Sequence, residues 1–150
     1  MSALTLELAS RIVDTALGRA GQLGLKPLTV AVLDPGGHLV AFKRQDASGI
    51  LRPEIAQGKA WGALGMGLGS RSLAQRAQIA PAFFVSLASA SHGRLFPVPG
   101  GVLIRGAGGE VLGAVGVSGD SPDNDESCAV CGIEAAGLGA DPGVAAGLQA

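Results

Sequence analysis

Charged and aromatic side chains are scarce in this 150-residue sequence. Lysine and arginine total 11, aspartate and glutamate total 12, and the formal net charge is -1. The absence of a basic surplus excludes a nucleic-acid clamp, which needs clustered positive charge. Aromatic residues make up 3% of the chain and include no tyrosine, so a stacking platform for single-stranded bases is also disfavoured. We therefore expect no nucleic-acid partner.

Cysteines and long apolar runs are also few. The two cysteines, Cys128 and Cys131, fall short of the number that a secreted disulfide scaffold requires. No apolar run approaches the roughly 18 residues of a membrane-spanning helix, and the N-terminus has no basic segment followed by an apolar run. We expect a single domain over residues 1–150, a frayed tail over about 140–150, no membrane partner and a cytoplasmic location.

The shortage of charge bears on assembly. Charged residues make up 15% of the chain, against about 25% in an average protein. This leaves little polar cover for the surface of a monomer. The composition therefore predicts a homo-oligomer, and symmetric dimers are the commonest form.

Glycine, in contrast, is abundant, with 25 residues and no collagen-like period. Such a content indicates tight turns and close approaches of one backbone to another or to a ligand. The pair Gly100-Gly101 follows Pro99 and opens a predicted strand. We expect backbone to approach another element or a ligand there, and a larger residue at position 101 to strain the chain.

Hydrophobic periodicity and turn residues predict alternating helices and strand pairs. Each strand pair is joined by a short glycine-containing turn, which makes the sheet antiparallel. Residues 79–98 are expected to be irregular, apart from a short helix or strand at 83–87. The predicted elements are a helix over 3–23, strands 28–34 and 38–44, a helix from Pro53 to about 64, a helix over 71–78 capped by Ser70, strands 101–106 and 110–117, and a last helix from Ser121-Pro122. The order α-β-β-α-(α)-β-β-α is typical of an α/β protein of the α+β kind, with helices covering an antiparallel sheet.

The common catalytic signatures are absent: there is no dinucleotide fingerprint, no P-loop and no nucleophile elbow. Cys128 and Cys131 lie about two turns into the last predicted helix, where we interpret them as small packed residues. The acidic residues that begin this helix are interpreted as caps that complement its dipole.

Five polar residues remain as candidates for chemistry. Lys59 lies on a helix with little other charge and either faces a pocket or extends along the surface. Arg44 and Asp46 flank the end of the second strand, as ligand contacts or as an ordinary ion pair. His38 is interpreted as a solvated turn residue or a metal ligand, and His92 lies in an irregular segment, where functional residues are common.

Several strings occur together in a characteristic order and spacing. They are Val30-Ala-Val-Leu-Asp34-Pro-Gly-Gly-His-Leu-Val, Arg44-Gln-Asp46, Lys59-Ala60, Pro97-Val-Pro99-Gly100-Gly101-Val-Leu-Ile104 and Gly113-Ala-Val-Gly116-Val-Ser118-Gly119, the last followed by an acidic helix start. From about residue 4 to residue 138, the chain resembles the GlcG/HbpS-like family, which includes the haem-binding protein HbpS and the C-terminal domain of PduO-type corrinoid adenosyltransferases.

The resemblance implies a profilin-like antiparallel sheet flanked by helices, assembly into homo-oligomers and, in some members, haem binding. It carries no shared catalytic motif to this chain. The positions that match the family pattern are Asp34, Arg44, Asp46, Lys59, Gly100, Gly101 and Ser118.

The leading hypothesis is an oligomeric protein that binds a small molecule, haem or a related tetrapyrrole. The expected ligand-binding residues are Arg44, Asp46, Lys59, Gly100, Gly101 and Ser118, and the expected iron ligands are His92 and His38. Lys59 and Arg44 would meet the propionates. His92 is preferred for the iron because a loop adjusts to a planar ring more readily than a paired strand. Acidic neighbours make a ligand from the cysteine pair unfavourable.

Two alternatives stay open. A small catabolic enzyme acting on an organic acid requires Asp46, Lys59 and a histidine to converge within hydrogen-bonding distance. A structural accessory subunit requires only a large interface.

Overall fold

The computed structural model describes residues 3–144 of the chain, and its element order agrees with the predicted one. Two elements are added to that order, a fourth helix and a fifth strand. The elements are α1 (Leu6–Leu23), β1 (Thr29–Leu33), β2 (Leu39–Arg44), α2 (Arg52–Met66), α3 (Ser70–Ile79), α4 (Pro81–Ala90), β3 (Gly101–Arg105), β4 (Val111–Ser118), α5 (Pro122–Ala135) and β5 (Gly139–Asp141).

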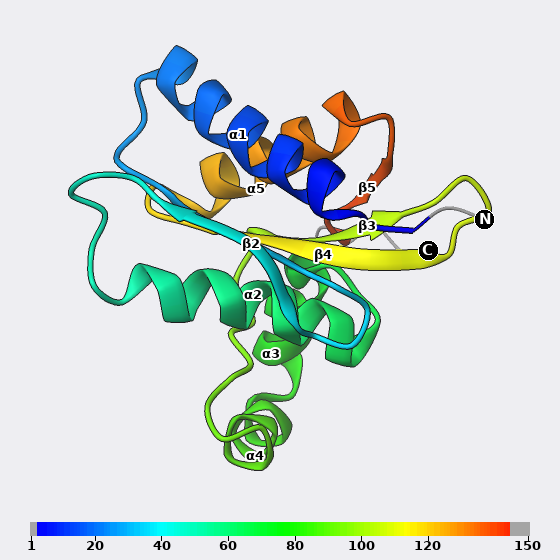
Figure 1. Ribbon diagram of the computed structural model, residues 1–150. Helices are drawn as coiled ribbons and strands as arrows, with labels where there is room; N and C mark the ends of the chain where they lie inside the picture. Colours follow the sequence, from blue (N-terminus) through cyan, green and yellow to red (C-terminus); the bar gives the residue numbers. More distant parts are fainter. Residues whose placement is uncertain (1–2, 145–150) are drawn as a thin grey trace.

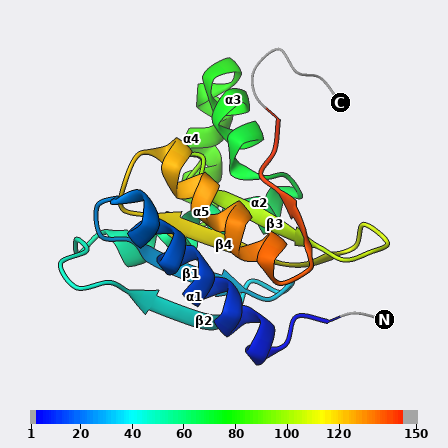
Figure 2. The same ribbon diagram turned by 90° about the horizontal axis from the view of Figure 1, so that it is seen from above.

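One antiparallel sheet of five strands, ordered β2-β1-β4-β3-β5, organises the molecule. Figure 1 shows α1 and α5 on one face of the sheet and α2 on the other, with α3 and α4 beyond α2. Seen from above in Figure 2, α1 and α5 lie side by side across the strands. The predicted fold class is therefore confirmed.

Alternation along the strands divides the core between the two faces of the sheet. Val30 and Val32 of β1 and Val115 and Val117 of β4 are fully buried under α1 and α5. The small cluster on the opposite face includes Leu33 with side chains of α2. Both faces are covered, so β1 and β4 are buried along almost their whole length.

The helix ends follow from local chemistry. Thr5 accepts a hydrogen bond from the Leu8 backbone N–H, and Gly24 ends α1 in the left-handed conformation. α5 begins at Pro122, as predicted, and Ser121 caps it by accepting a hydrogen bond from the Asn124 N–H. Ser70, predicted to be a cap, is instead the first residue of α3, and its hydroxyl accepts from the Gly101 N–H at 2.7 Å.

Glycines in the sheet let α2 lie directly on it. A Cβ on Gly116 would lie 1.8 Å from the Ala56 carbonyl oxygen, and one on Gly101 would lie 2.2 Å from the Lys59 carbonyl oxygen. The close approach expected at Gly100-Gly101 is therefore an approach to α2. Only Gly100 of the pair has a positive φ, +124°, so the constraint at Gly101 is steric, which corrects the expected φ strain.

Two segments differ from the sequence expectations. Residues 81–90, expected to be largely irregular, form α4, and residues 139–141 pair with β3 as β5. The tail expected to fray from about residue 140 is thus ordered through the end of β5, and residues 145–150 lie outside the described residues. Among the helices of residues 3–144, none has the length and apolar character needed to cross a membrane.

The packing of α2 on the sheet is tested by Gly101→Val. The added side chain meets the Lys59 carbonyl, so we expect the free energy of unfolding to fall by about 1–3 kcal/mol in chemical denaturation. Gly18→Ala is the matched control, because Gly18 lies in α1 with nothing within 4 Å of its would-be Cβ. We expect this control to be neutral or up to about 1 kcal/mol more stable. Equal stability of Gly101→Val and the wild type would contradict the steric account.

Candidate functional site

Two grooves bring candidate residues together. The first, which we call the Trp61 groove, has a volume of about 360 Å³ and lies between the β1–β2 turn, α2 and the segment after α4. Its walls include Gly37, Gln57, Gly58, Trp61, His92 and Arg94. The second, the α1–β2 groove, has a volume of about 570 Å³ and lies where α1 ends beside the last residues of β2.

Glycines bring three separate segments of chain close enough to form the Trp61 groove. Gly37 has a φ of +84°, and a Cβ there would lie 3.1 Å from the Trp61 indole. A Cβ on Gly58 would lie 2.9 Å from the Arg94 carbonyl oxygen. The Phe96 N–H donates to the Gly58 carbonyl at 3.2 Å, which fastens the segment after α4 to α2. The groove therefore depends on backbone packing that side chains at these positions would prevent.

A guanidinium lies over the aromatic ring in this groove. The Arg94 Cζ is 4.2 Å from the centroid of the Trp61 ring, within the range of a cation–π interaction. The Arg94 Nε donates to the Ser91 carbonyl at 3.2 Å. These two contacts orient a positive charge at the wall of the groove.

His92 lies on the wall of the Trp61 groove in an unusual backbone conformation. Its φ is +56°, a value rare for residues other than glycine and found more often at functional sites. It follows Ser91, the C-cap residue of α4, and it is exposed. An imidazole with an accessible ring is suited to bind a metal ion or to transfer a proton.

His38 is placed differently. It follows Gly37 but is not among the lining residues of the groove, and its side chain is 81% exposed. Its Nδ1 lies 3.2 Å from the Asp34 carboxylate, which also accepts from the backbone N–H groups of Gly36 and His38. These hydrogen bonds lower the pKa of Asp34, the backbone donor of His38 contributing most.

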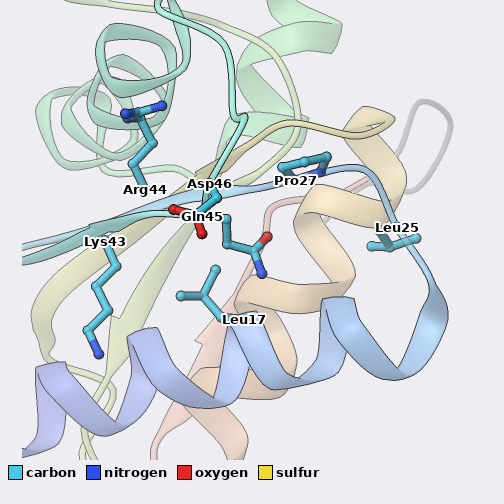
Figure 3. Close-up of a pocket in the computed structure, with 7 residues that line it drawn as sticks. All are labelled: Leu17, Leu25, Pro27, Lys43, Arg44, Gln45 and Asp46. Atoms are coloured by element: carbon cyan, nitrogen blue, oxygen red, sulfur yellow. The ribbon is translucent and has the colours of Figure 1, made fainter.

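The α1–β2 groove contains Arg44 and Asp46, but it does not use them as a pair. Figure 3 shows the Arg44 side chain pointing away from Leu17 and Gln45, which lie within the groove. The Arg44 guanidinium donates to the Ser48 carbonyl at 2.7 Å, and no Arg44–Asp46 ion pair forms between these two described residues. The Arg44 side chain thus stabilises the turn that follows β2 by its hydrogen bond to the Ser48 carbonyl.

Lys59 is neither a surface residue nor a pocket residue. It is 2% exposed, and its Nζ donates to the Val117 carbonyl at 2.8 Å and to the Asp125 carboxylate at 3.2 Å. Burial lowers the pKa of the Lys59 ammonium and raises the pKa of the Asp125 carboxyl, while their mutual attraction opposes both shifts. A Cβ on Gly100 would lie 2.8 Å from the Lys59 Nζ, so the glycine leaves the path of the side chain open.

Two further residues that the sequence analysis discussed, Ser118 and Cys128, lie in the interior. Ser118 is fully buried and accepts from the Arg52 guanidinium at 3.0 Å. Cys128 is a residue of α5 whose side chain lies in the core, where burial and the nearby Asp125 carboxylate raise the pKa of its thiol to about 11. Cys128 and Cys131 are on α5, which covers the face of the sheet opposite α2.

The structure therefore separates the residues that an organic-acid enzyme requires. Asp46 is at the α1–β2 groove, His92 is at the Trp61 groove, and Lys59 is buried with Asp125. Sequence reasoning did not select Trp61 or Arg94. The signal available for Trp61 was that it is the one tryptophan of the chain.

An antiparallel five-stranded sheet covered on both faces, with a groove beside α2, defines the class of the molecule as a small α+β domain. The family model of the haem degrading protein HbpS-like family matches residues 4–134. The chain belongs to this family, as the sequence motifs implied.

Solved structures agree with this assignment. A complex of PduOC with haem is 28% identical, with a TM-score of 0.83 over 92% of this chain and 98% of that one. HbpS is 29% identical, with a TM-score of 0.76 over 90% and 91% of the two chains. The protein ORFY of Klebsiella pneumoniae, 23% identical with a TM-score of 0.81 over 91% and 92%, shares the fold. A comparison with curated proteins finds no significant match.

The buried ion pair gives a stability prediction. Asp125→Asn leaves the Lys59 ammonium buried without its counter-charge, so we expect the free energy of unfolding to fall by about 3–5 kcal/mol. The double variant Lys59→Met/Asp125→Leu removes both charges and should recover most of that loss. Asp14→Asn, which breaks the exposed Lys43–Asp14 pair, is the control and should cost less than about 1 kcal/mol. Equal effects of Asp125→Asn and Asp14→Asn in urea denaturation would contradict this account.

Proposed function

We propose that this protein binds haem or a related tetrapyrrole in the Trp61 groove. The observation that carries the proposal is the convergence of an imidazole, an indole and a guanidinium on one groove, from His92, Trp61 and Arg94. The similarity to PduOC, whose complex with haem has the same fold, supports it. Haem, when bound, supplies an iron centre for redox or ligand-exchange chemistry.

The residues of the groove fit such a ligand. Neutral imidazole is a common axial ligand of haem iron, and the part of the Trp61 indole that Arg94 does not cover offers apolar surface to a flat ring. A volume of about 360 Å³ is near the lower end of ligand cavities, which span about 300–1,000 Å³. The groove would therefore enclose part of a porphyrin and leave one edge for other contacts.

His92 is the iron ligand that we propose first. His38 is the second candidate, since it adjoins Gly37 of the groove wall. The cysteine pair is disfavoured, because Cys128 has a raised thiol pKa and lies in the layer beyond the sheet. For the other expected ligand-binding residues, direct ligand contact stays a prediction: these are Arg44, Asp46, Lys59, Gly100, Gly101 and Ser118.

We also propose that the protein acts as a homo-oligomer. Helix α4 contains no charged residue, and of its side chains only Phe84 is buried. Ile79, Phe83 and Val85 are 75%, 54% and 71% exposed on α3 and α4. An apolar helix with so little cover is typical of an interface. Because α4 ends next to His92, a second copy bound there would lie near the Trp61 groove.

Haem titration followed by the Soret band tests the binding site. We expect saturable binding to the wild type, and binding weakened by about tenfold or more with an altered band in His92→Asn. Asparagine is chosen because it tolerates the positive φ of this position. His38→Ala and Cys131→Ala are the comparison variants, and both should retain the wild-type spectrum.

Three results would contradict parts of this proposal. A spectrum altered only by His38→Ala would move the iron ligand to the β1–β2 turn. A spectrum altered only by Cys131→Ala would reject both histidines. No Soret change with the wild type would reject haem binding itself.

The mass in solution tests the proposed assembly. Val85→Glu places a charge on the exposed apolar surface of α4, so we expect light scattering to show a smaller species than the wild type at the same micromolar concentration. Ile50→Glu is the matched control, because Ile50 is an apolar residue that is 89% exposed and belongs to the loop between β2 and α2 rather than to α4. A monomeric wild type, or dissociation by the control alone, would be inconsistent with an interface on α4.

A further inference from the structure

We propose that the Trp61 groove selects ligands that carry carboxylates at their edge, and that Arg94 is the residue that binds them. This inference rests on the proposed function, since it assigns the ligand class of the same groove. It names a specificity residue that neither the sequence motifs nor the similarity to known proteins identifies.

The first support is the hydrogen-bonding capacity that Arg94 has left. A guanidinium carries five N–H donors, and only the Nε–H of Arg94 has a partner among residues 3–144, the Ser91 carbonyl. Within the same described residues, no carboxylate lies within ion-pair distance of Arg94. Arg71 and Arg105, in contrast, are paired with acidic side chains. Arg94, an exposed residue at the wall of the groove, therefore presents a positive charge that has no ion-pair partner among residues 3–144.

The second support is that this charge is held in a fixed orientation. The Arg94 Cζ lies 4.2 Å from the centroid of the Trp61 ring and Nε donates to the Ser91 carbonyl, so two contacts hold the guanidinium while its terminal N–H groups have no partner among residues 3–144. The backbone of the segment is fixed by the Phe96–Gly58 hydrogen bond and by the close packing of Gly58. An oriented guanidinium matches the two oxygens of a carboxylate and loses little conformational entropy on binding.

The third support is the distribution of charge around the groove. Glu54 also lines it, from the first turn of α2. A carboxylate of the ligand is repelled near Glu54 and attracted near Arg94, so the two residues together orient an acidic ligand. Lys59, which the sequence suggested for this role, is buried with Asp125 and is not among the lining residues. The chemical class that fits is a flat ring system with acidic side chains, as in haem, rather than a neutral one.

The test compares ferric haem with its dimethyl ester, in which both propionates are neutral, for the wild type and Arg94→Gln. We expect esterification to weaken binding to the wild type by about tenfold or more, because charge-assisted hydrogen bonds are lost. Arg94→Gln should bind haem about as weakly as the wild type binds the ester, and should show little difference between the two compounds. Arg94→Lys keeps the positive charge but loses the planar guanidinium that can donate two parallel hydrogen bonds to a carboxylate. Its preference for haem over the ester should lie between those of the wild type and Arg94→Gln.

Arg76→Gln is the matched control, since it removes a positive charge from the end of α3, outside the groove. It should keep the wild-type preference for haem over the ester, which separates local recognition from the overall charge of the protein. Thermal melts of each variant show whether the fold is retained. Equal binding of haem and ester by the wild type would overturn the inference and leave haem binding standing. If Arg94→Gln weakened the binding of haem and of the ester by the same factor, the inference would also be overturned. If the wild type bound neither compound, both the inference and the proposed function would be rejected.

Discussion

The buried ion pair between Lys59 and Asp125 joins the two sides of the molecule. Lys59 comes from α2 and Asp125 from α5, which cover opposite faces of the sheet, and they meet beside the Val117 carbonyl where β4 ends. Gly100 leaves the space through which the lysine reaches. Side chains two residues apart on a helix point in different directions. Because the Lys59 side chain points toward Asp125, the Trp61 side chain of the same helix points elsewhere and lines the groove. The ion pair thus fixes the helix that carries the proposed site.

Glycine is the second constraint, and it acts on both sides of α2. On one side, Gly101 and Gly116 of the sheet lack side chains that would collide with the backbone of α2, so the helix packs directly on the strands. Glycines of the helix itself admit the chain after α4 from the other: a Cβ on Gly58 would meet the Arg94 carbonyl, and one on Gly62 would meet Leu95. These four positions therefore require glycine for steric reasons. The glycines serve close backbone packing, which in turn creates the walls of the groove.

The sequence predicted those features that local patterns determine. The period of α1, the start of α5 at Pro122 and the two hairpins follow from residues near one another in the chain. Helix α4 was anticipated only as a short helix or strand at 83–87, because its sequence is almost entirely apolar and therefore shows no clear helical period. The partners of Lys59 and Trp61 lie far along the chain, at Asp125 and Arg94, and only the folded structure brings them together. The candidate site was thus predicted in part: His92 lines a groove, whereas Lys59 is buried in an ion pair with Asp125 and is not among the groove residues.

The central claim is that the ligand lies in the Trp61 groove, and NMR measures this most directly. The chain has one tryptophan, so the indole N–H of Trp61 gives a single, assignable signal. Gallium protoporphyrin, a diamagnetic analogue of haem, is added to ¹⁵N-labelled protein. The account predicts that the Trp61 indole signal and the amide signals of Gly37 and Gly58 shift as the analogue saturates the site. An unchanged Trp61 signal, with shifts at Gln45 in the α1–β2 groove instead, would contradict it.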